Sequence, residues 1–94
     1  MKSGYVCITT NKPHGVLYVG ATANIHQRLW QHKTAQGSVF RKQYVARRCA
    51  HIERFDDIRD ALAREKNMKK WRREWKVKLI DKTNPEWRDL TEDL

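Results

Sequence analysis

The chain has 94 residues, a length that fits one domain and leaves no room for two independent cores. Its hydrophobic share of 39% and aromatic share of 10% can build a small core, which excludes a disordered chain. The 20 Lys and Arg residues outnumber the 11 Asp and Glu residues and give a net charge of +9, so polyanions are the expected partners. We predict one domain over residues 1–94, with a core over about 3–80 and a C-terminal turn over 84–94.

Two strands joined by a tight turn are predicted at the start of the chain. Residues 5–9 and 16–19 are rich in the β-branched and aromatic side chains that favour strands. Between them, residues 11–15 read Asn-Lys-Pro-His-Gly, which is a concentration of turn-forming residues. This pattern predicts a hairpin.

A first helix is predicted over residues 25–33. Asn24 precedes it as a candidate N-cap, and Gln27 follows three residues later in the capping-box position. Ile25 and Leu29 then fall on one face of the helix.

A basic loop and a third strand are expected next. The Gly-Ser pair at 37–38 interrupts the helical pattern, and residues 41–48 are rich in arginine and lysine. Residues 49–55 alternate weakly between apolar and polar side chains, which favours a strand.

The second helix is predicted to begin at Asp56 or Asp57 and to carry a glutamate on its apolar stripe. The apolar residues that recur at helical spacing are Ile58, Ala61, Leu62 and Met68. At about 100° per residue, Glu65 lies between the directions of Ala61 and Leu62, so its carboxylate points toward the core side. A structural explanation is an ion pair with a core-facing arginine or a position at the core margin. A metal ligand is the sharper alternative.

A third helix, or a bent continuation of the second, is predicted up to Asp81. Its apolar residues at four-residue spacing are Trp71, Trp75 and Leu79. Pro85 follows Asn84 and ends regular structure, because proline cannot continue a helix. Trp87 and Leu90 then belong to a terminal turn whose apolar side chains close over the core.

The positive charge is concentrated in the second half of the chain. Residues 59–78 hold nine basic and three acidic residues, whereas residues 81–94 hold two basic and five acidic ones. Nucleic acid is favoured over a membrane surface, because the sequence lacks an amphipathic anchor and an acylation signal. No base-reading motif accompanies the basic residues, so we expect phosphate contacts without sequence-specific recognition. The candidate DNA-binding residues are Arg41, Lys42, Lys66, Lys69, Lys70 and Arg73.

Membrane and export signals are missing from the sequence. The longest apolar runs, 5–8 and 16–19, are far shorter than the roughly 18 residues that a membrane span needs. The first residues have no secretory pattern, so we expect a cytoplasmic protein. Cys7 and Cys49 lack any Cys-x-x-Cys spacing, which predicts buried thiols and argues against a zinc site.

The ordered set of motifs resembles the GIY-YIG nucleases, over nearly the whole chain. Tyr18-Val19-Gly20 is similar to the second half of the family signature, and Arg28 and His32 match an Arg-x-x-x-His helix that follows it. Small stand-alone bacterial members of the family are similar at further segments, namely Gly4-Tyr5-Val6-Cys7-Ile8, Glu53, Arg64-Glu65-Lys66, Lys70-Trp71 and Asn84-Pro85-Glu86-Trp87.

The resemblance implies a catalytic role for several residues. Glu65 matches the family's metal-binding glutamate and would hold a single divalent ion, Mg²⁺ or Mn²⁺. Arg28 would bind the scissile phosphate, and Tyr18 would orient or deprotonate the attacking water. His32, one turn beyond Arg28, would contact phosphate or relay a proton.

Cys7 is the clear departure from the family pattern. Family members place a tyrosine about eleven positions before the second motif tyrosine, and counting back from Tyr18 reaches Cys7. Tyr5 lies two residues earlier in the same expected strand, and strand side chains alternate, so Tyr5 shares a face with Cys7. We therefore include Tyr5 among the candidate catalytic residues as a partial replacement for the missing phenol.

The sequence is interpreted as an α+β domain, a small three-stranded sheet flanked by helices in the order β-β-α-β-α-α. It would act as a metal-dependent DNA endonuclease, selective for DNA structure and not for sequence, and would need no small-molecule cofactor. Cys7 motivates an alternative, a nucleic-acid-binding module that has lost cleavage. A third interpretation is a domain that docks a DNA repair or recombination enzyme. A monomer or a weak dimer is expected.

Overall fold

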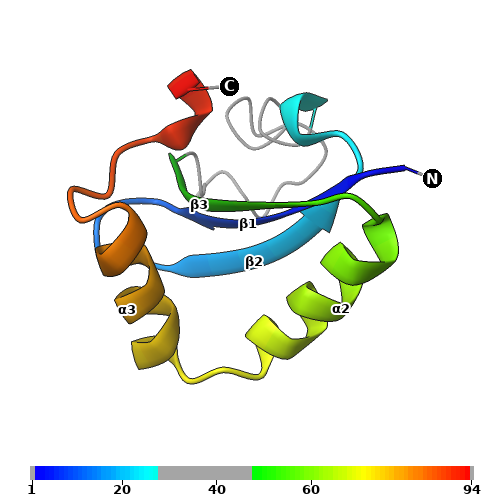
Figure 1. The fold of residues 1–94 in the computed structure, drawn as a ribbon. Coiled ribbons are helices and arrows are strands. Elements are labelled where there is room, and N and C mark those ends of the chain that lie inside the picture. Colours follow the sequence, from blue (N-terminus) through cyan, green and yellow to red (C-terminus); the bar gives the residue numbers. More distant parts are fainter. Residues whose placement is uncertain (1, 28–47, 94) are drawn as a thin grey trace, which may run out of the picture.

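The sheet of this protein has three antiparallel strands in the order β2-β1-β3 (Figure 1). The structure is a computed structural model and describes residues 2–27 and 48–93. Strand β1 spans Gly4–Thr10, β2 spans Leu17–Thr22 and β3 spans Arg48–Phe55. The predicted hairpin, the predicted third strand and the α+β class are therefore confirmed.

One side-chain and one backbone hydrogen bond close the turn between β1 and β2. The Asn11 side-chain oxygen accepts from the Val16 amide at 2.9 Å, and the Gly15 amide donates to the Lys12 carbonyl at 2.9 Å. His14 has a φ of 58°, a left-handed conformation that a tight reversal needs and that most residues avoid. Because Leu17 is the first residue of β2, the exposed Val16 belongs to the turn and not to the predicted strand.

Helices α2 and α3 cover one face of the sheet, and residues 90–93 and 25–27 lie on the other (Figure 1). Helix α2 spans Ile58–Lys69 and α3 spans Arg73–Thr83. Val6 and Ile8 of β1 point to the α2–α3 face and are fully buried. Their neighbour Cys7 points to the opposite face, where it packs with Ile25 and Cys49.

The start of α2 lies directly against β1. Asp57 is its N-cap and accepts from the Arg59 amide at 2.9 Å, which confirms one of the two predicted starting positions. A Cβ atom on Gly4 would lie 2.5 Å from Ile58 Cδ1, so only glycine allows the helix to come this close to the strand.

Two residues that were predicted on the buried stripes are exposed. Leu62 is 49% exposed, because the buried arc of α2 is centred on Ala61 and Met68 and Leu62 lies about 100° away from Ala61. Trp75 is 51% exposed, because α2 ends at Lys69 and α3 begins in a new direction at Arg73. The predicted third helix is therefore separate from the second. The four-residue spacing from Trp71 to Trp75 crosses the link between the helices and does not define one helical face.

The C-terminal segment closes over the core, as predicted. Trp87 is 1% exposed, and its indole N–H donates to Asp81 Oδ1 at 2.7 Å. The Asn84 side chain donates to the Ala50 carbonyl at 3.1 Å and to the Arg88 carbonyl at 2.9 Å. The 3-10 helix η2, Leu90–Asp93, follows.

No helix in the described part of the chain combines the length and the apolar character that crossing a membrane requires.

Candidate functional site

The two candidate catalytic tyrosines, Tyr5 and Tyr18, lie on the face of the sheet opposite to α2 and α3. In the antiparallel register Cys7 is the partner of Gly20, and Thr9 is the partner of Tyr18. Partners in the register share a face, and Tyr5, Cys7 and Thr9 alternate onto the same face of β1. Tyr18 therefore lies on the face that carries Tyr5 and Cys7. Tyr18 is 43% exposed, because β2 is an edge strand of the sheet.

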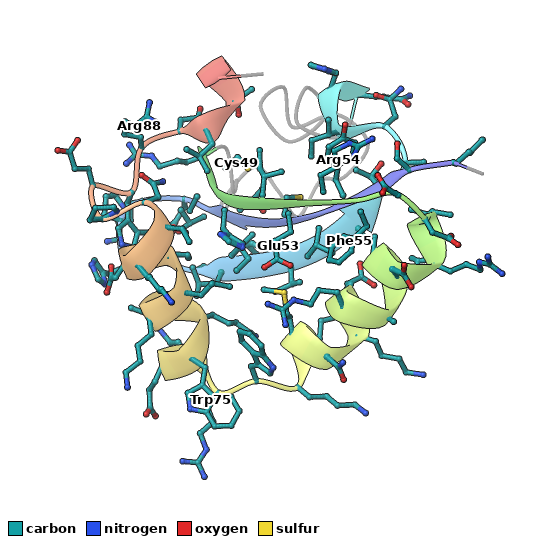
Figure 2. The ribbon with its side chains drawn as sticks, viewed as in Figure 1. Cys49, Glu53, Arg54, Phe55, Trp75 and Arg88 are labelled. Atoms are coloured by element: carbon teal, nitrogen blue, oxygen red, sulfur yellow. The ribbon has the colours of Figure 1, made fainter. Side chains whose placement is uncertain are left out.

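Arg54 lies beside Tyr5 and was not among the predicted site residues. The two are partners across β1 and β3. Arg54 donates a hydrogen bond to the Asp56 carboxylate at 2.9 Å and another to the Tyr5 phenol, and these contacts, that with Asp56 first, raise the pKa of Arg54. Figure 2 shows Arg54 on the side of the sheet away from α2 and α3. Sequence spacing carries no signal for this pair, because the register of β3 is a long-range property.

An open depression of about 560 Å³ adjoins Tyr5 on the same face. The residues that line it are Lys2, Ser3, Tyr5, Ala23, Asn24, Ile25 and His26. Asn24 also accepts from the Gln27 amide at 3.1 Å, which confirms it as the predicted cap of a helix that begins at Ile25. The half-buried Tyr5 thus lines an open depression that also holds polar side chains and one lysine, Lys2.

Four predicted site residues lie outside the described residues, so the structure gives no account of their side chains. They are Arg28, His32, Arg41 and Lys42. Residues 25–27, where the helix predicted to carry Arg28 and His32 begins, lie on the face that carries Tyr5 and Tyr18.

Cys7, at the position of the missing tyrosine, is enclosed in the sheet. Its side chain is 1% exposed and packs against Ile25 and Cys49. Both cysteines are buried, as predicted. Burial, followed by the neighbouring Cys7, raises the pKa of the Cys49 thiol. Neither thiol is presented to solvent as a nucleophile or a metal ligand.

Glu65 lies on α2 at the margin of the core. Its side chain is 22% exposed, and Oε1 lies 3.8 Å from Lys69 Nζ, one helical turn further on. The sequence also allowed an ion pair between Glu65 and a core-facing arginine, but Arg64 forms its ion pair with Glu53. Of the two structural explanations, the position at the core margin therefore describes Glu65, and this position is compatible with a metal ligand.

A partly buried polar network connects β3 with both helices, and the sequence did not predict it as a unit. Arg64 donates from Nε to Glu53 Oε1 at 2.9 Å and from Nη2 to Oε2 at 3.1 Å. The His51 ring lies 2.8 Å from Glu53 Oε2 and, at its other nitrogen, 3.1 Å from the Thr83 hydroxyl. Burial raises the pKa of Glu53, but hydrogen bonds from Arg64 and His51 outweigh burial and leave this pKa below its ordinary value.

The predicted DNA-binding residues of α2 and α3 divide into two kinds. Lys66, Lys69 and Lys70 are exposed at the C-terminal end of α2. Arg73 instead donates to the backbone carbonyls of His14 and Gly15, both at 2.7 Å. Arg73 thereby connects α3 to the β1–β2 turn, and the lysines are the simpler candidates for phosphate contacts.

The tyrosines and the glutamate belong to opposite faces of the sheet. Tyr5 and Tyr18 lie on one face, whereas Glu65 belongs to a helix that packs on the other. Helix α2 contacts β2, the edge strand that carries Tyr18. Within residues 2–27 and 48–93, no three His, Cys, Asp or Glu side chains form a group that could hold a metal ion.

Comparison with known proteins identifies the family. The family model described as the GIY-YIG catalytic domain matches residues 3–78. A UPF0213 protein of Syntrophus aciditrophicus is 38% identical over 71 residues, which cover 74% of this chain and 80% of that protein. A UPF0213 protein of Staphylococcus saprophyticus is 34% identical over 80 residues, covering 85% of this chain and 96% of that protein. No solved structure matches.

Proposed function

Because this chain belongs to the GIY-YIG nuclease family, we propose that it is a metal-dependent endonuclease that hydrolyses phosphodiester bonds in DNA. The observation that carries the proposal is Tyr18, the signature phenol, which is 43% exposed on the edge strand β2. A phenol so exposed can meet a phosphate group and its attacking water. The family match supports a nuclease-type enzyme with DNA as its substrate.

The edge of the sheet at β2 is the proposed point of attack. A substrate at this edge meets Tyr18 from one face and approaches α2, the helix of Glu65, on the other. In this proposal Tyr18 orients or deprotonates the water, and Arg28 binds the scissile phosphate. His32 contacts phosphate or relays a proton, and Arg54, beside Tyr5, adds a cation on the tyrosine face.

Glu65 is the proposed metal ligand. GIY-YIG nucleases generally use divalent metal ions. The carboxylate of Glu65 fits such an ion, because its 3.8 Å separation from Lys69 Nζ is too long for a hydrogen bond and leaves oxygen lone pairs to donate. One carboxylate, with water and a substrate phosphate, suits Mg²⁺ or Mn²⁺. The ion would polarise the phosphoryl oxygens and stabilise their developing charge.

Substrate selection is proposed to depend on DNA structure. The net charge of +9 and the exposed lysines at 66, 69 and 70 favour contacts with phosphates. Phosphate contacts position a protein on nucleic acid, whereas contacts to base edges specify a sequence. We therefore expect binding that is insensitive to sequence.

A second candidate function is a nucleic-acid-binding module without cleavage. The observation that favours it is the burial of Cys7, which leaves only a shorter and weaker hydrogen-bonding group where the family has a phenol. The same basic surface would still bind DNA. A docking domain for a DNA repair enzyme is the third candidate, and it requires negligible binding of free DNA.

One experiment separates these functions. The pure protein is incubated with supercoiled, branched and single-stranded DNA, with Mg²⁺, with Mn²⁺ and with a chelator. Nicking that needs the metal supports the nuclease. Binding without nicking under every condition favours the binding module, and negligible binding of every DNA form favours the docking domain.

A further inference from the structure

An exposed tryptophan lies outside the proposed nuclease site. Trp75, in the first turn of α3, is 51% exposed. Figure 2 shows it next to the α2–α3 link, at the end of the molecule farthest from the sheet. A large aromatic ring exposed to this degree has no role in the core, so its solvent-facing surface needs another explanation.

The ring of Trp75 is held in place by a chain of contacts that begins in the sheet. Its centroid lies 6.2 Å from that of Trp71, with an interplanar angle of 73°, which is the favourable edge-to-face arrangement. The Arg64 guanidinium lies over Trp71, with Cζ 4.9 Å from the ring centroid. Arg64 is itself fixed by its two hydrogen bonds to Glu53 of β3. Trp75 is therefore positioned before any ligand arrives, which lowers the entropic cost of binding.

The charges around Trp75 indicate its ligand. Residues 69–78 hold six basic residues and one acidic residue, and Lys69, Lys70 and Arg72 are exposed. A second copy of this chain seated here would bring the same cations into opposition, which disfavours a dimer at this surface. A polyanion that carries flat apolar groups would fit both the basic residues and the exposed ring of Trp75.

Unpaired nucleobases are such groups. In a duplex the base faces are covered by neighbouring pairs, whereas in single-stranded DNA they can stack on an aromatic side chain beside basic residues that contact the backbone. We propose that Trp75 is a stacking platform for an unpaired base, and that the substrate class is DNA with a single-stranded segment. This inference rests on the proposed function in taking DNA as the substrate, and it does not require that cleavage occur.

The test compares dissociation constants for an oligothymidine of about 12 nucleotides and for a duplex of the same length, by fluorescence anisotropy at one salt concentration. Trp75→Ala is expected to weaken binding of the single strand about tenfold or more and binding of the duplex less than about twofold. Trp75→Phe keeps a flat ring and should retain most of the affinity. Trp75→Leu keeps apolar area without a π-face and should behave like Trp75→Ala.

Leu62→Ala is the matched control, because Leu62 is an apolar residue with nearly the same exposure on the other helix. It should leave both dissociation constants unchanged. Equal losses for single strand and duplex, or retained affinity in Trp75→Leu, would overturn the proposal. A parent protein that sediments as a dimer, with Trp75→Ala as a monomer, would also overturn it.

The nuclease proposal is judged separately in the same set of variants. If the parent prefers the single strand through Trp75 but nicks no DNA with any metal, the stacking platform stands and the nuclease fails. If the parent nicks DNA but Trp75→Ala has the parent's binding profile, the nuclease stands and the platform is rejected.

Discussion

Arg64 on α2 donates two hydrogen bonds to Glu53 on β3, at 2.9 Å and 3.1 Å, and so connects the helix to the sheet at both carboxylate oxygens. The same guanidinium lies over the ring of Trp71, in the link between α2 and α3. This pair therefore sets the position of α2, which carries Glu65, and supports the aromatic contact to Trp75.

The stability of the fold is expected to fall in acid through Glu53. Its pKa in the folded protein is below the ordinary value of about 4.3, so its ionised form contributes stability above that pH and loses it as the pH falls through the lowered pKa. Glu53→Gln should lower the free energy of unfolding by about 2 kcal/mol at pH 7, and the difference should shrink at pH 3. Urea denaturation of the parent and the variant at pH 7 and at pH 3 measures the difference in unfolding free energy.

Asp56→Asn is the control for this experiment, because Asp56 is 95% exposed and its ion pair with Arg54 lies in solvent. It should have little effect at either pH. A destabilisation by Glu53→Gln that is the same at pH 7 and pH 3 would contradict the ionic role of Glu53.

Glu65→Gln is expected to abolish metal-dependent cleavage and to retain DNA binding. The amide keeps the shape of the side chain but loses the charge that a divalent ion needs. Plasmid nicking and anisotropy measure the two properties, and circular dichroism checks the fold. Glu74→Gln, which alters an exposed carboxylate in the first turn of α3, is the control and should cleave like the parent. A Glu65→Gln variant that nicks at the parental rate would remove Glu65 from the metal site.

DNA affinity should fall steeply with salt, because each neutralised phosphate releases counterions and contributes a slope of about −0.9 on duplex DNA. Changing Lys66, Lys69 and Lys70 together to alanine should weaken binding of all duplex sequences alike and reduce that slope by up to about 2.7. Titrations at several salt concentrations give the slope. Arg73 is left intact in this variant, because it holds the β1–β2 turn through the carbonyls of His14 and Gly15. An affinity independent of salt would favour the docking domain.

Cys7→Tyr is expected to raise the cleavage rate with little change in DNA affinity, because it restores the phenol of the family pattern. The structure adds a cost: Cys7 is fully packed, so the larger ring should destabilise the fold by about 1–3 kcal/mol. Single-turnover cleavage and thermal unfolding measure the two effects.

Tyr5→Phe tests whether Tyr5 has taken over the role of the missing tyrosine. Its phenol contacts Arg54 and faces the open depression, so its loss should lower any remaining cleavage by on the order of a hundredfold. Unchanged cleavage in Tyr5→Phe, together with no gain in Cys7→Tyr, would mean that neither position takes part in the chemistry.

Asn84 should be the most sensitive polar residue of the C-terminal segment. Its side chain donates to the carbonyls of Ala50 and Arg88 and accepts from the Arg88 amide at 3.1 Å. Asn84→Ala leaves buried backbone groups unpaired and should cost about 2–4 kcal/mol of unfolding free energy. Asn84→Asp keeps the acceptor and loses the donors. Thermal unfolding should rank the parent above both variants, and equal melting temperatures would contradict this role.

Much of the fold was predictable because it depends on neighbours in the sequence. The turn residues at 11–15, the cap at Asn24 and the cap at Asp57 act within a few positions, so their sequence signals are local. The family motifs were likewise readable, because each is a short run with defined spacing. These signals were sufficient for the three strands, the two long helices and the nuclease family.

The contacts between distant residues were decided by the tertiary structure alone. Arg64 and Glu53 meet across eleven residues, and Tyr5 meets Arg54 through the register of β1 and β3. Helical spacing predicted Leu62 and Trp75 in the core, but both are exposed. Their burial depends on which side of α2 faces the sheet and on the direction in which α3 begins. A periodic pattern defines which residues share a face, whereas only the assembled sheet and helices decide which faces are covered and which remain open to a substrate.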